Sequence, residues 1–167
     1  MWVIAAIRQI LVNHATFTKL VDERMASGSV SMLRMQLDIG ARTNALFLVE
    51  EPEEVARRVL QGEVLNMFRD RDGKRLLDGY LFDQLLLREE KWKQLLERFR
   101  YLGCAHIHFS AAAVQRSIQR ISETEIEFRD VFEDDFANNK EREDTTLAME
   151  VVTHAVGTVV LDVFNKF

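Results

Sequence analysis

The spacing of the apolar residues changes near Gly28. Before that residue, apolar side chains recur every three or four residues, as on one face of an amphipathic helix, with an interruption near Asn13. These positions are Val3, Ile4, Ile7, Ile10, Leu11, Phe17, Leu20, Val21 and Met25. Arg8, Gln9 and Asn13 are expected on the exposed side of this helix. The pattern therefore predicts a helical start that breaks near Asn13 and ends at Gly28.

Beyond Gly28 the spacing becomes that of strands. Apolar and polar residues alternate over 33–39, as they do when one face of a strand is buried. The segment 45–50 is a second and more continuously apolar run, and 40–44 has the composition of a turn. The two runs predict an antiparallel pair of strands.

Pro52 marks the start of another helix. Acidic residues follow it and arginines precede Gly62, which is the order that the helix dipole favours. Asp72-Gly73 lies between apolar-rich flanks and predicts a hairpin with a type I′ turn. An apolar stripe over 83–102 then predicts one long amphipathic helix, capped by Gly103. The stripe consists of Leu85, Trp92, Leu95, Leu96, Phe99 and Leu102.

The rest of the chain is predicted to be mostly strand. A short strand over 104–110, a short helix over 111–121 and an alternating strand over 124–132 follow the long helix. The stretch 145–164 has apolar residues at helical spacing, but its density of Val and Thr favours strands. The sum is a single α+β domain over 1–167, with antiparallel hairpins, an N-terminal helix and one long amphipathic helix packed on the sheet.

The single cysteine of the chain lies close to two histidines, at Cys104, His106 and His108. On a strand these three side chains share one face, and a thiolate with two imidazoles is a zinc-binding set. This pattern is the basis of an alternative function, a metal-dependent enzyme with a Cys-x-His-x-His site. A structural zinc site needs four ligands, however, and neither His14 nor His154 is fixed nearby. Cys and His also suit an ordinary amphipathic strand, so we predict no resident metal or cofactor.

Charge is concentrated in one part of the chain. The net charge is −5, and the segment 123–144 carries ten acidic residues against three basic ones. An acidic balance disfavours nucleic-acid binding, which depends on neutralising phosphates. The candidate footprint for that weaker alternative is a basic cluster, which a solvated hairpin tip explains equally well. Its members are Arg69, Arg71, Lys74 and Arg75.

Acidic residues also suggest a cation site. Glu123, Glu125 and Glu127 share one face of the predicted strand, and three more acids follow at 133–135. Carboxylates of this kind would suit Mg²⁺ or Ca²⁺, but a solvated acidic edge that resists strand-to-strand aggregation explains them better.

The composition is that of a cytoplasmic globular protein. Hydrophobic residues make up 47% and charged residues 29%, and one cysteine is compatible with a reducing compartment. No apolar run approaches the ~20 residues that cross a bilayer, so no membrane partner is expected. The chain has no Gly-x-Ser-x-Gly elbow, P-loop or dinucleotide-binding turn, which favours a non-enzymatic function.

Large apolar residues occupy both ends of the chain, where residues are normally polar and loose. They are Trp2, Val3, Ile4, Val163, Phe164 and Phe167. Such residues either fold back onto the core of their own chain or meet a neighbouring subunit, where aromatic anchors are frequent. We predict that they lie at a subunit interface of a homo-oligomer that works with other assembly proteins.

The segment IAAIRQILVNHATFTKLVDERMASG, residues 4–28, resembles the start of bacteriophage tail-terminator and tail-completion proteins. Those proteins begin with an amphipathic helix and a short second helix that ends near an acidic residue and an arginine, and strands follow. The resemblance implies an α+β fold and a non-enzymatic virion subunit that forms a ring and caps or joins a phage tail. It covers about the first 28 residues, and the proline-containing segment usual before the first strand of that family is missing here.

Overall fold

The computed structural model describes residues 1–107, 118–122, 125–128 and 135–167, and most of these residues are helical. In chain order the elements are α1 (Trp2–Asp22), α2 (Ala26–Asn44), η1 (Ala45–Phe47), α3 (Pro52–Leu60), η2 (Leu65–Met67), α4 (Asp78–Arg88), η3 (Glu90–Trp92), α5 (Lys93–Ile107), β1 (Ile118–Ile121), β2 (Ile126–Phe128) and α7 (Asn139–Lys166). Within the described ranges, extended pairing is limited to the antiparallel β1–β2 hairpin and one bridge between Arg69 and Arg75. The predicted α+β fold is therefore wrong, and the chain is all-α in class.

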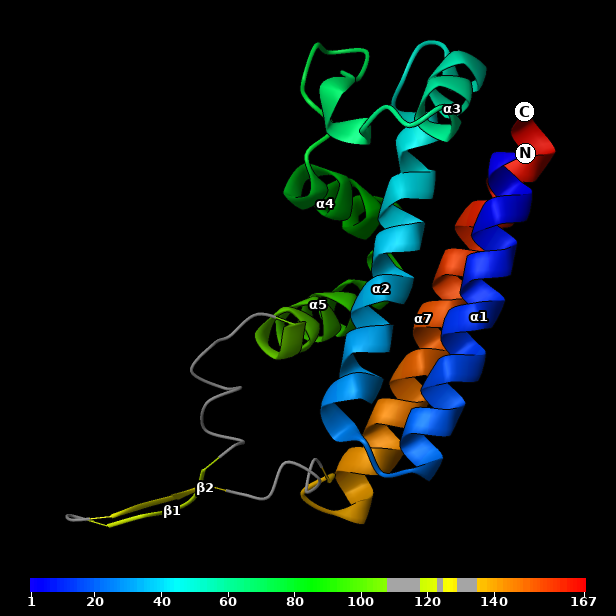
Figure 1. Ribbon diagram of the computed structural model, residues 1–167. Helices are drawn as coiled ribbons and strands as arrows, with labels where there is room; N and C mark the ends of the chain where they lie inside the picture. The colour runs from blue at the N-terminus through cyan, green and yellow to red at the C-terminus, as the bar shows by residue number, and fades with distance from the viewer. Residues whose placement is uncertain (108–117, 123–124, 129–134) are drawn as a thin grey trace.

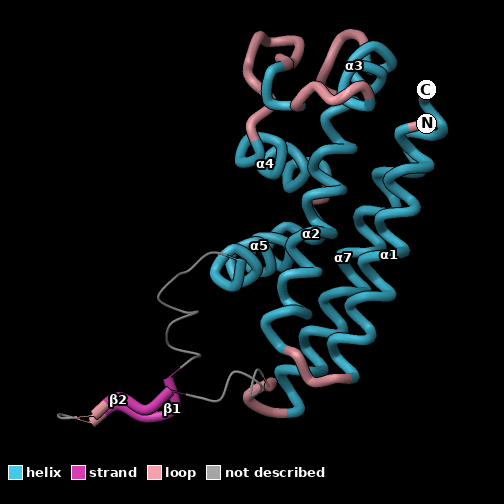
Figure 2. The backbone as a smooth tube through the Cα atoms, viewed as in Figure 1, coloured by secondary structure: helices cyan, strands magenta, loops and turns pink. Residues whose placement is uncertain are grey.

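α2 is the central helix. It packs against α1 and α7 on one side and against α4 and α5 on the other (Figure 1). α1 runs antiparallel to both α2 and α7, so the two chain ends meet at the end of the bundle where α3 lies. Figure 2 shows that the longest loop segments at this end connect α3 to α4.

α1 is one uninterrupted helix, so the predicted break near Asn13 is wrong. Its buried positions are spaced by three or four residues, and Asn13 is one of them, only 2% exposed. The side-chain amide of Gln9 donates to Asn13 Oδ1 at 2.9 Å, which satisfies the buried oxygen from the preceding turn. The helix also ends earlier than Gly28, because Arg24 takes a left-handed conformation with φ of 59°.

α2 and η1 occupy the segment in which two strands were predicted. The buried residues of α2 recur at helical spacing, and they are Ala26, Ser29, Val30, Leu33, Gln36, Leu37, Gly40, Ala41, Thr43 and Asn44. Met35 is 41% exposed whereas Gln36 is fully buried, so the alternation over 33–39 does not separate buried from exposed positions. Seven of the ten buried residues of α2 are small or polar, so a pattern of large apolar residues does not reveal this face.

α7 replaces the strands predicted over 145–164. Asn138 Oδ1 accepts the backbone N–H of Glu141 at 2.9 Å and caps the helix. Every third or fourth residue from Thr145 to Val163 is buried against the bundle, which outweighs the weak helix propensity of Val and Thr. The length and composition of α7 would also allow it to cross a membrane. However, 44% of its apolar stretch is buried inside the protein, and the core helix of a soluble bundle can have the same length and composition.

The middle of the chain also departs from the predictions. The long helix expected over 83–102 is two helices, α4 and α5, separated by η3, and Gly103 lies inside α5. Asp72-Gly73 is a turn with φ of 79° at Gly73, but Asp72 does not have the positive φ of a type I′ turn. The helix predicted over 111–121 ends in the strand β1, and its remainder lies outside the described residues.

Two predicted elements are confirmed here. The helix after Pro52 is α3, and Gly62 follows it with φ of 102°. The strand expected over 124–132 is present in part as β2; Glu125 is not in the strand, and 124 and 129–132 lie outside the described residues.

Candidate interaction site at the chain ends

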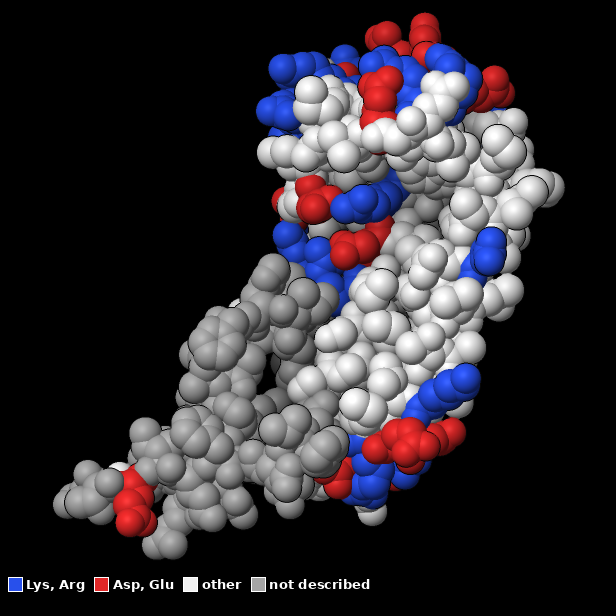
Figure 3. Space-filling model, viewed as in Figure 1, with Lys and Arg blue, Asp and Glu red and all other residues white. Residues whose placement is uncertain are grey.

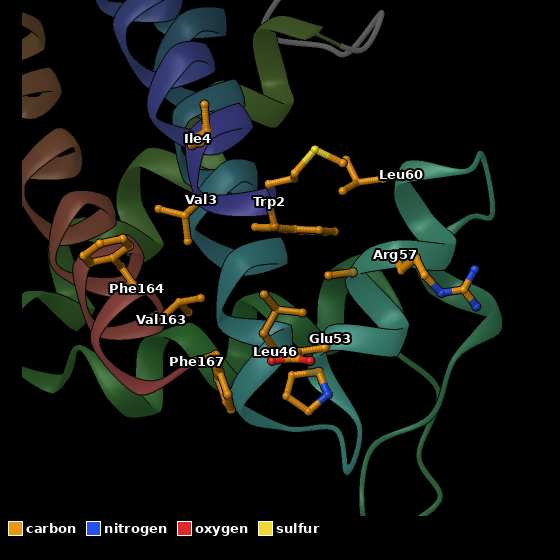
Figure 4. Close-up of a pocket in the computed structure, with 13 residues that line it drawn as sticks. Trp2, Val3, Ile4, Leu46, Glu53, Arg57, Leu60, Val163, Phe164 and Phe167 are labelled. Carbon is orange, nitrogen blue, oxygen red and sulfur yellow. The ribbon is translucent and has the colours of Figure 1, made fainter.

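An apolar groove of about 530 Å³ lies where the two chain ends meet α3 (Figure 4). It is lined by Met1, Trp2, Val3, Ile4, Leu46, Pro52, Glu53, Ala56, Arg57, Leu60, Val163, Phe164 and Phe167. All six residues predicted at an interface are in this set. The antiparallel course of α1 and α7 brings them together, although they come from opposite ends of the chain.

Trp2 and Val163 anchor the chain ends to the bundle. The indole Nε1 of Trp2 donates to Thr43 Oγ1 of α2 at 3.3 Å, and its ring packs against both clusters of buried core residues. Val163 is only 3% exposed. These two residues therefore serve the core of their own chain, and the interface role of all six stays a prediction.

Phe167 is held in position by its neighbours. Its ring lies 5.9 Å from that of Phe47, with the planes tilted by 49°. The guanidinium of Arg88 lies 4.1 Å from the centre of the Phe47 ring, and Lys166 Nζ lies 5.3 Å from the centre of the Phe167 ring. Cations over ring faces stabilise such an arrangement. The C-terminal aromatic ring is thus ordered while remaining 46% exposed.

The remaining large residues of the groove are more exposed. Ile4 is 71% and Phe164 67% exposed, and Leu60 extends the apolar lining from α3. Glu53 and Arg57 are the charged side chains among the lining residues. The Arg57 guanidinium donates to the Glu54 carboxylate at 2.6 Å, which lowers the pKa of Glu54, and Figure 4 shows that it points away from the groove. The groove therefore offers apolar surface and lacks, among its described residues, an acid–base pair.

The apolar surface continues along the outer side of α1. Ile7 and Leu11 follow Ile4 at helical spacing, and they are 42% and 64% exposed. Between Val3 and Thr18 the helix carries a single Arg or Lys, Arg8, and no acidic residue. Figure 3 shows this face of the molecule as a largely uncharged band. On α7, Leu161 lies one turn before Phe164 and is 59% exposed.

The structure removes the geometric basis of the alternative metal site at Cys104, His106 and His108. Cys104 and His106 lie in α5, not on a strand, and His108 lies outside the described residues. On a helix, residues two positions apart do not share a face, so the argument for convergent ligands fails. Among the described residues there is no group of three or more His, Cys, Asp and Glu side chains that would hold a metal ion.

One acidic residue of this set, Asp135, forms an ion pair with a described residue. Asp135 accepts from Arg24 Nε at 2.8 Å, and this contact holds the pKa of the Asp135 carboxyl below its usual range. Glu125 is exposed and Glu127 lies in β2, while Glu123 and the acids at 133 and 134 lie outside the described residues. The ion pair joins the α1–α2 connection to the segment before α7, so a structural role explains Asp135.

Sequence reasoning did not find the other side of the groove. Leu46, Pro52, Ala56 and Leu60 come from η1 and α3 and were not candidates for any site. Their apolar spacing on a short helix is visible in the sequence, but nothing in it indicates that α3 lies beside the chain ends. That proximity follows from α2, which was predicted as strands.

Comparison of the chain with family models, with curated proteins and with solved structures finds no match. The resemblance to phage tail-terminator proteins therefore has no support from these comparisons, and the α+β fold that it implies is not the fold observed.

Proposed function

We propose that the protein is a non-enzymatic assembly subunit that associates with a second copy of itself. The interface comprises the groove at the chain ends and the outer side of α1, which together we call the terminal face. Beside the lining of the groove, its large exposed apolar side chains include Ile4, Ile7, Leu11, Leu161 and Phe164. The supporting observation is that these large apolar side chains are exposed and adjoin a groove already lined by apolar residues.

The energetics favour association. Burying one such side chain fully is worth about 1.5–3 kcal/mol, and their present partial burial reduces this amount. A two-fold axis would bring the same face of two copies together and bury five such residues from each. Their sum is comparable to or larger than the free-energy cost of bringing two proteins together. That cost is roughly 4–15 kcal/mol of lost translational and rotational freedom.

A ring-forming component of a phage tail or neck is the most specific version of this function. It stays a prediction that rests on the N-terminal resemblance alone. The alternative function, a metal-dependent enzyme, required Cys104 and His106 to share one face of a strand. Both residues lie on a helix instead, where positions two apart do not share a face.

Size-exclusion chromatography with light scattering tests the proposal. We expect a mass of at least two chains at micromolar concentration, and a monomer when Ile7 or Phe164 is replaced by Glu. Met35→Glu is the matched control, since Met35 is 41% exposed on α2 and Ile7 is 42% exposed on α1. A monomeric wild type at high micromolar concentration, or equal disruption by Met35→Glu, would contradict the proposal.

A further inference from the structure

The last residue of α3 and its connection to α4, which we call the tip (residues 60–77), combine two kinds of exposed side chain. It consists of a loop, the short helix η2, and a turn closed by the bridge between Arg69 and Arg75. Figure 3 shows the basic residues of this region gathered at one corner of the molecule. Its chemistry differs from that of the terminal face.

The basic residues of the turn form no ion pair with a carboxylate within the described ranges of the chain. Arg69 donates to the backbone oxygen of Gly73 at 2.6 Å, and Arg75 donates to that of Asn66 at 3.2 Å. Lys74 Nζ lies 4.0 Å from the centre of the Tyr80 ring. No ion pair joins Arg69, Arg71, Lys74 or Arg75 to an acid in the described part of the chain. Contacts with backbone oxygens and a ring leave the full positive charge of these groups at the surface.

The acid inside the turn faces inward. Asp70 is only 9% exposed, and its Oδ1 accepts the backbone N–H groups of Asp72 and Lys74 at 3.0 and 2.7 Å. Its other oxygen accepts the hydroxyl of Tyr80. Asp72 is exposed, so the turn presents four cations against one outward-facing acid. The inward position of the Asp70 carboxylate adds to the excess of cations at the surface of the turn.

Aliphatic side chains lie beside these cations. Val64 is 59% and Met67 65% exposed, and the Met67 sulfur lies 3.8 Å from Arg75 Nη2. Leu60 and Leu77, at the two ends of the tip, are 47% and 49% exposed. Single-stranded nucleic-acid sites present aromatic rings for base stacking, whereas the aromatic residue between Met67 and Arg69 is the buried Phe68. Aliphatic groups next to cations suit the boundary between lipid headgroups and acyl chains.

We infer that the tip is a docking surface for an anionic lipid bilayer. The cations attract negatively charged headgroups, and Val64 and Met67 insert between them. This is a peripheral contact and requires no membrane-crossing helix. It revises the expectation of no membrane partner. The length of apolar runs identifies helices that cross a bilayer, but not loops that bind at its surface.

Sedimentation with phosphatidylcholine vesicles containing about one third phosphatidylserine tests this inference. We expect binding that weakens with salt and is much weaker for pure phosphatidylcholine. Each surface cation changes the affinity about fivefold, so Arg71→Glu with Lys74→Glu should weaken binding more than about 25-fold. Val64→Ser with Met67→Ser should weaken binding at every salt concentration.

Two control variants separate the tip from general effects. Lys93→Glu with Arg98→Glu makes the same change of net charge at exposed positions of α5 and should alter affinity less than about fivefold. Leu87→Ser removes an aliphatic side chain of similar exposure, 66%, from α4 and should leave binding unchanged. Circular dichroism identifies variants that fail to fold, and Arg71→Gln with Lys74→Gln is the milder replacement in that case.

Several outcomes would overturn the inference. They are absence of vesicle binding by the folded wild type, equal losses in the tip and α5 charge variants, and stronger binding to duplex DNA or polyglutamate than to the anionic vesicles. None of these three outcomes would change the oligomeric state measured by light scattering, because the tip substitutions leave the terminal face intact.

Discussion

Gly40 of α2 lies so close to α7 that a methyl group at its Cβ position would be 2.7 Å from Cγ2 of Val156. Real Cβ atoms do not approach carbon that closely. α2 and α7 can therefore come this close at residue 40 because it has no side chain. Replacement of Gly40 by Ala would force α2 and α7 apart or Val156 out of its rotamer. We expect a loss of about 1–3 kcal/mol in the free energy of unfolding, measured by urea denaturation.

Gly157, the residue after Val156, provides the control. It lies in the middle of α7, and a Cβ added there would meet nothing within 4 Å. Gly157→Ala should therefore raise the free energy of unfolding by about 0.5–1 kcal/mol, because Ala loses less conformational entropy in a helix. If both variants change stability equally, the close approach of Gly40 to Val156 does not limit the packing.

A second contact between the same helices is polar. Gln36 is fully buried, and its Nε2 donates to Thr153 Oγ1 at 3.2 Å, while its Oε1 has no hydrogen-bond partner among the residues that the structure describes. Thr153→Val would remove the remaining partner and should lower the free energy of unfolding by about 1–3 kcal/mol. Gln36→Leu removes the unsatisfied oxygen and should be neutral or stabilising.

The double variant Gln36→Leu with Thr153→Val tests whether the two effects have one origin. The loss caused by Thr153→Val should largely disappear when Gln36 is already Leu, and a double-mutant cycle measures this coupling. Additive effects of the two substitutions would show that the hydrogen bond contributes nothing specific to the packing of α2 on α7.

These contacts explain why the centre of the fold was not predictable from apolar spacing. Gly40 and Gln36 are buried on α2, and both are of residue types that such a pattern counts as polar or neutral. The alternating Leu and Met residues around Gln36 then imitate a strand. α7 was ambiguous for a different reason, since its β-branched residues favour strands locally while their spacing fits a helix. Burial against α2 decides the outcome, and it depends on segments distant in sequence.

α3 is defined by local signals and was predicted well. α3 has Pro52 at its start, glutamates in its first turn and Gly62 after its end, and each signal acts within a few residues. The candidate site was partly predictable for a related reason. The apolar ends of the chain were visible in the sequence, whereas the contribution of Leu46 and α3 required the correct path of α2.

The hydrogen bond from the Tyr80 hydroxyl to Asp70 predicts a pH dependence. It raises the pKa of Tyr80 to about 12 from the usual 10 and lowers that of Asp70. Because the folded pKa of Tyr80 is raised, its stabilising contribution is complete below pH 10 and is lost as the pH rises to 12. The contribution of Asp70 is present above the ordinary carboxyl pKa, 3.8, and is lost as the pH falls through its lower folded value.

Urea midpoints of the wild type and Tyr80→Phe, measured from pH 7 to 12, test this prediction. The wild type should be the more stable protein at pH 7, and the difference should shrink between pH 10 and 12. Comparison of the two proteins cancels the titration of other groups, including the exposed Tyr101. A difference that stays constant across that range would show that the Tyr80 hydroxyl does not stabilise the turn.

Trp2 reports on the terminal face directly. The chain has two tryptophans, so Trp92→Phe leaves Trp2 as the single tryptophan fluorophore. Trp2 lines the groove, and its indole N–H donates a hydrogen bond to Thr43 Oγ1. If a second copy covers the groove, the emission of Trp2 should move to shorter wavelength as concentration rises, because water is excluded from the ring. Ile7→Glu should abolish that shift without altering the spectrum of the dilute protein, whereas Met35→Glu should preserve it. Thr43→Val should lower the free energy of unfolding by about 0.5–1.5 kcal/mol through loss of the hydrogen bond. An increase in mass with no change in Trp2 emission would place the association on a different surface, since a partner seated on this groove would change the surroundings of the indole ring.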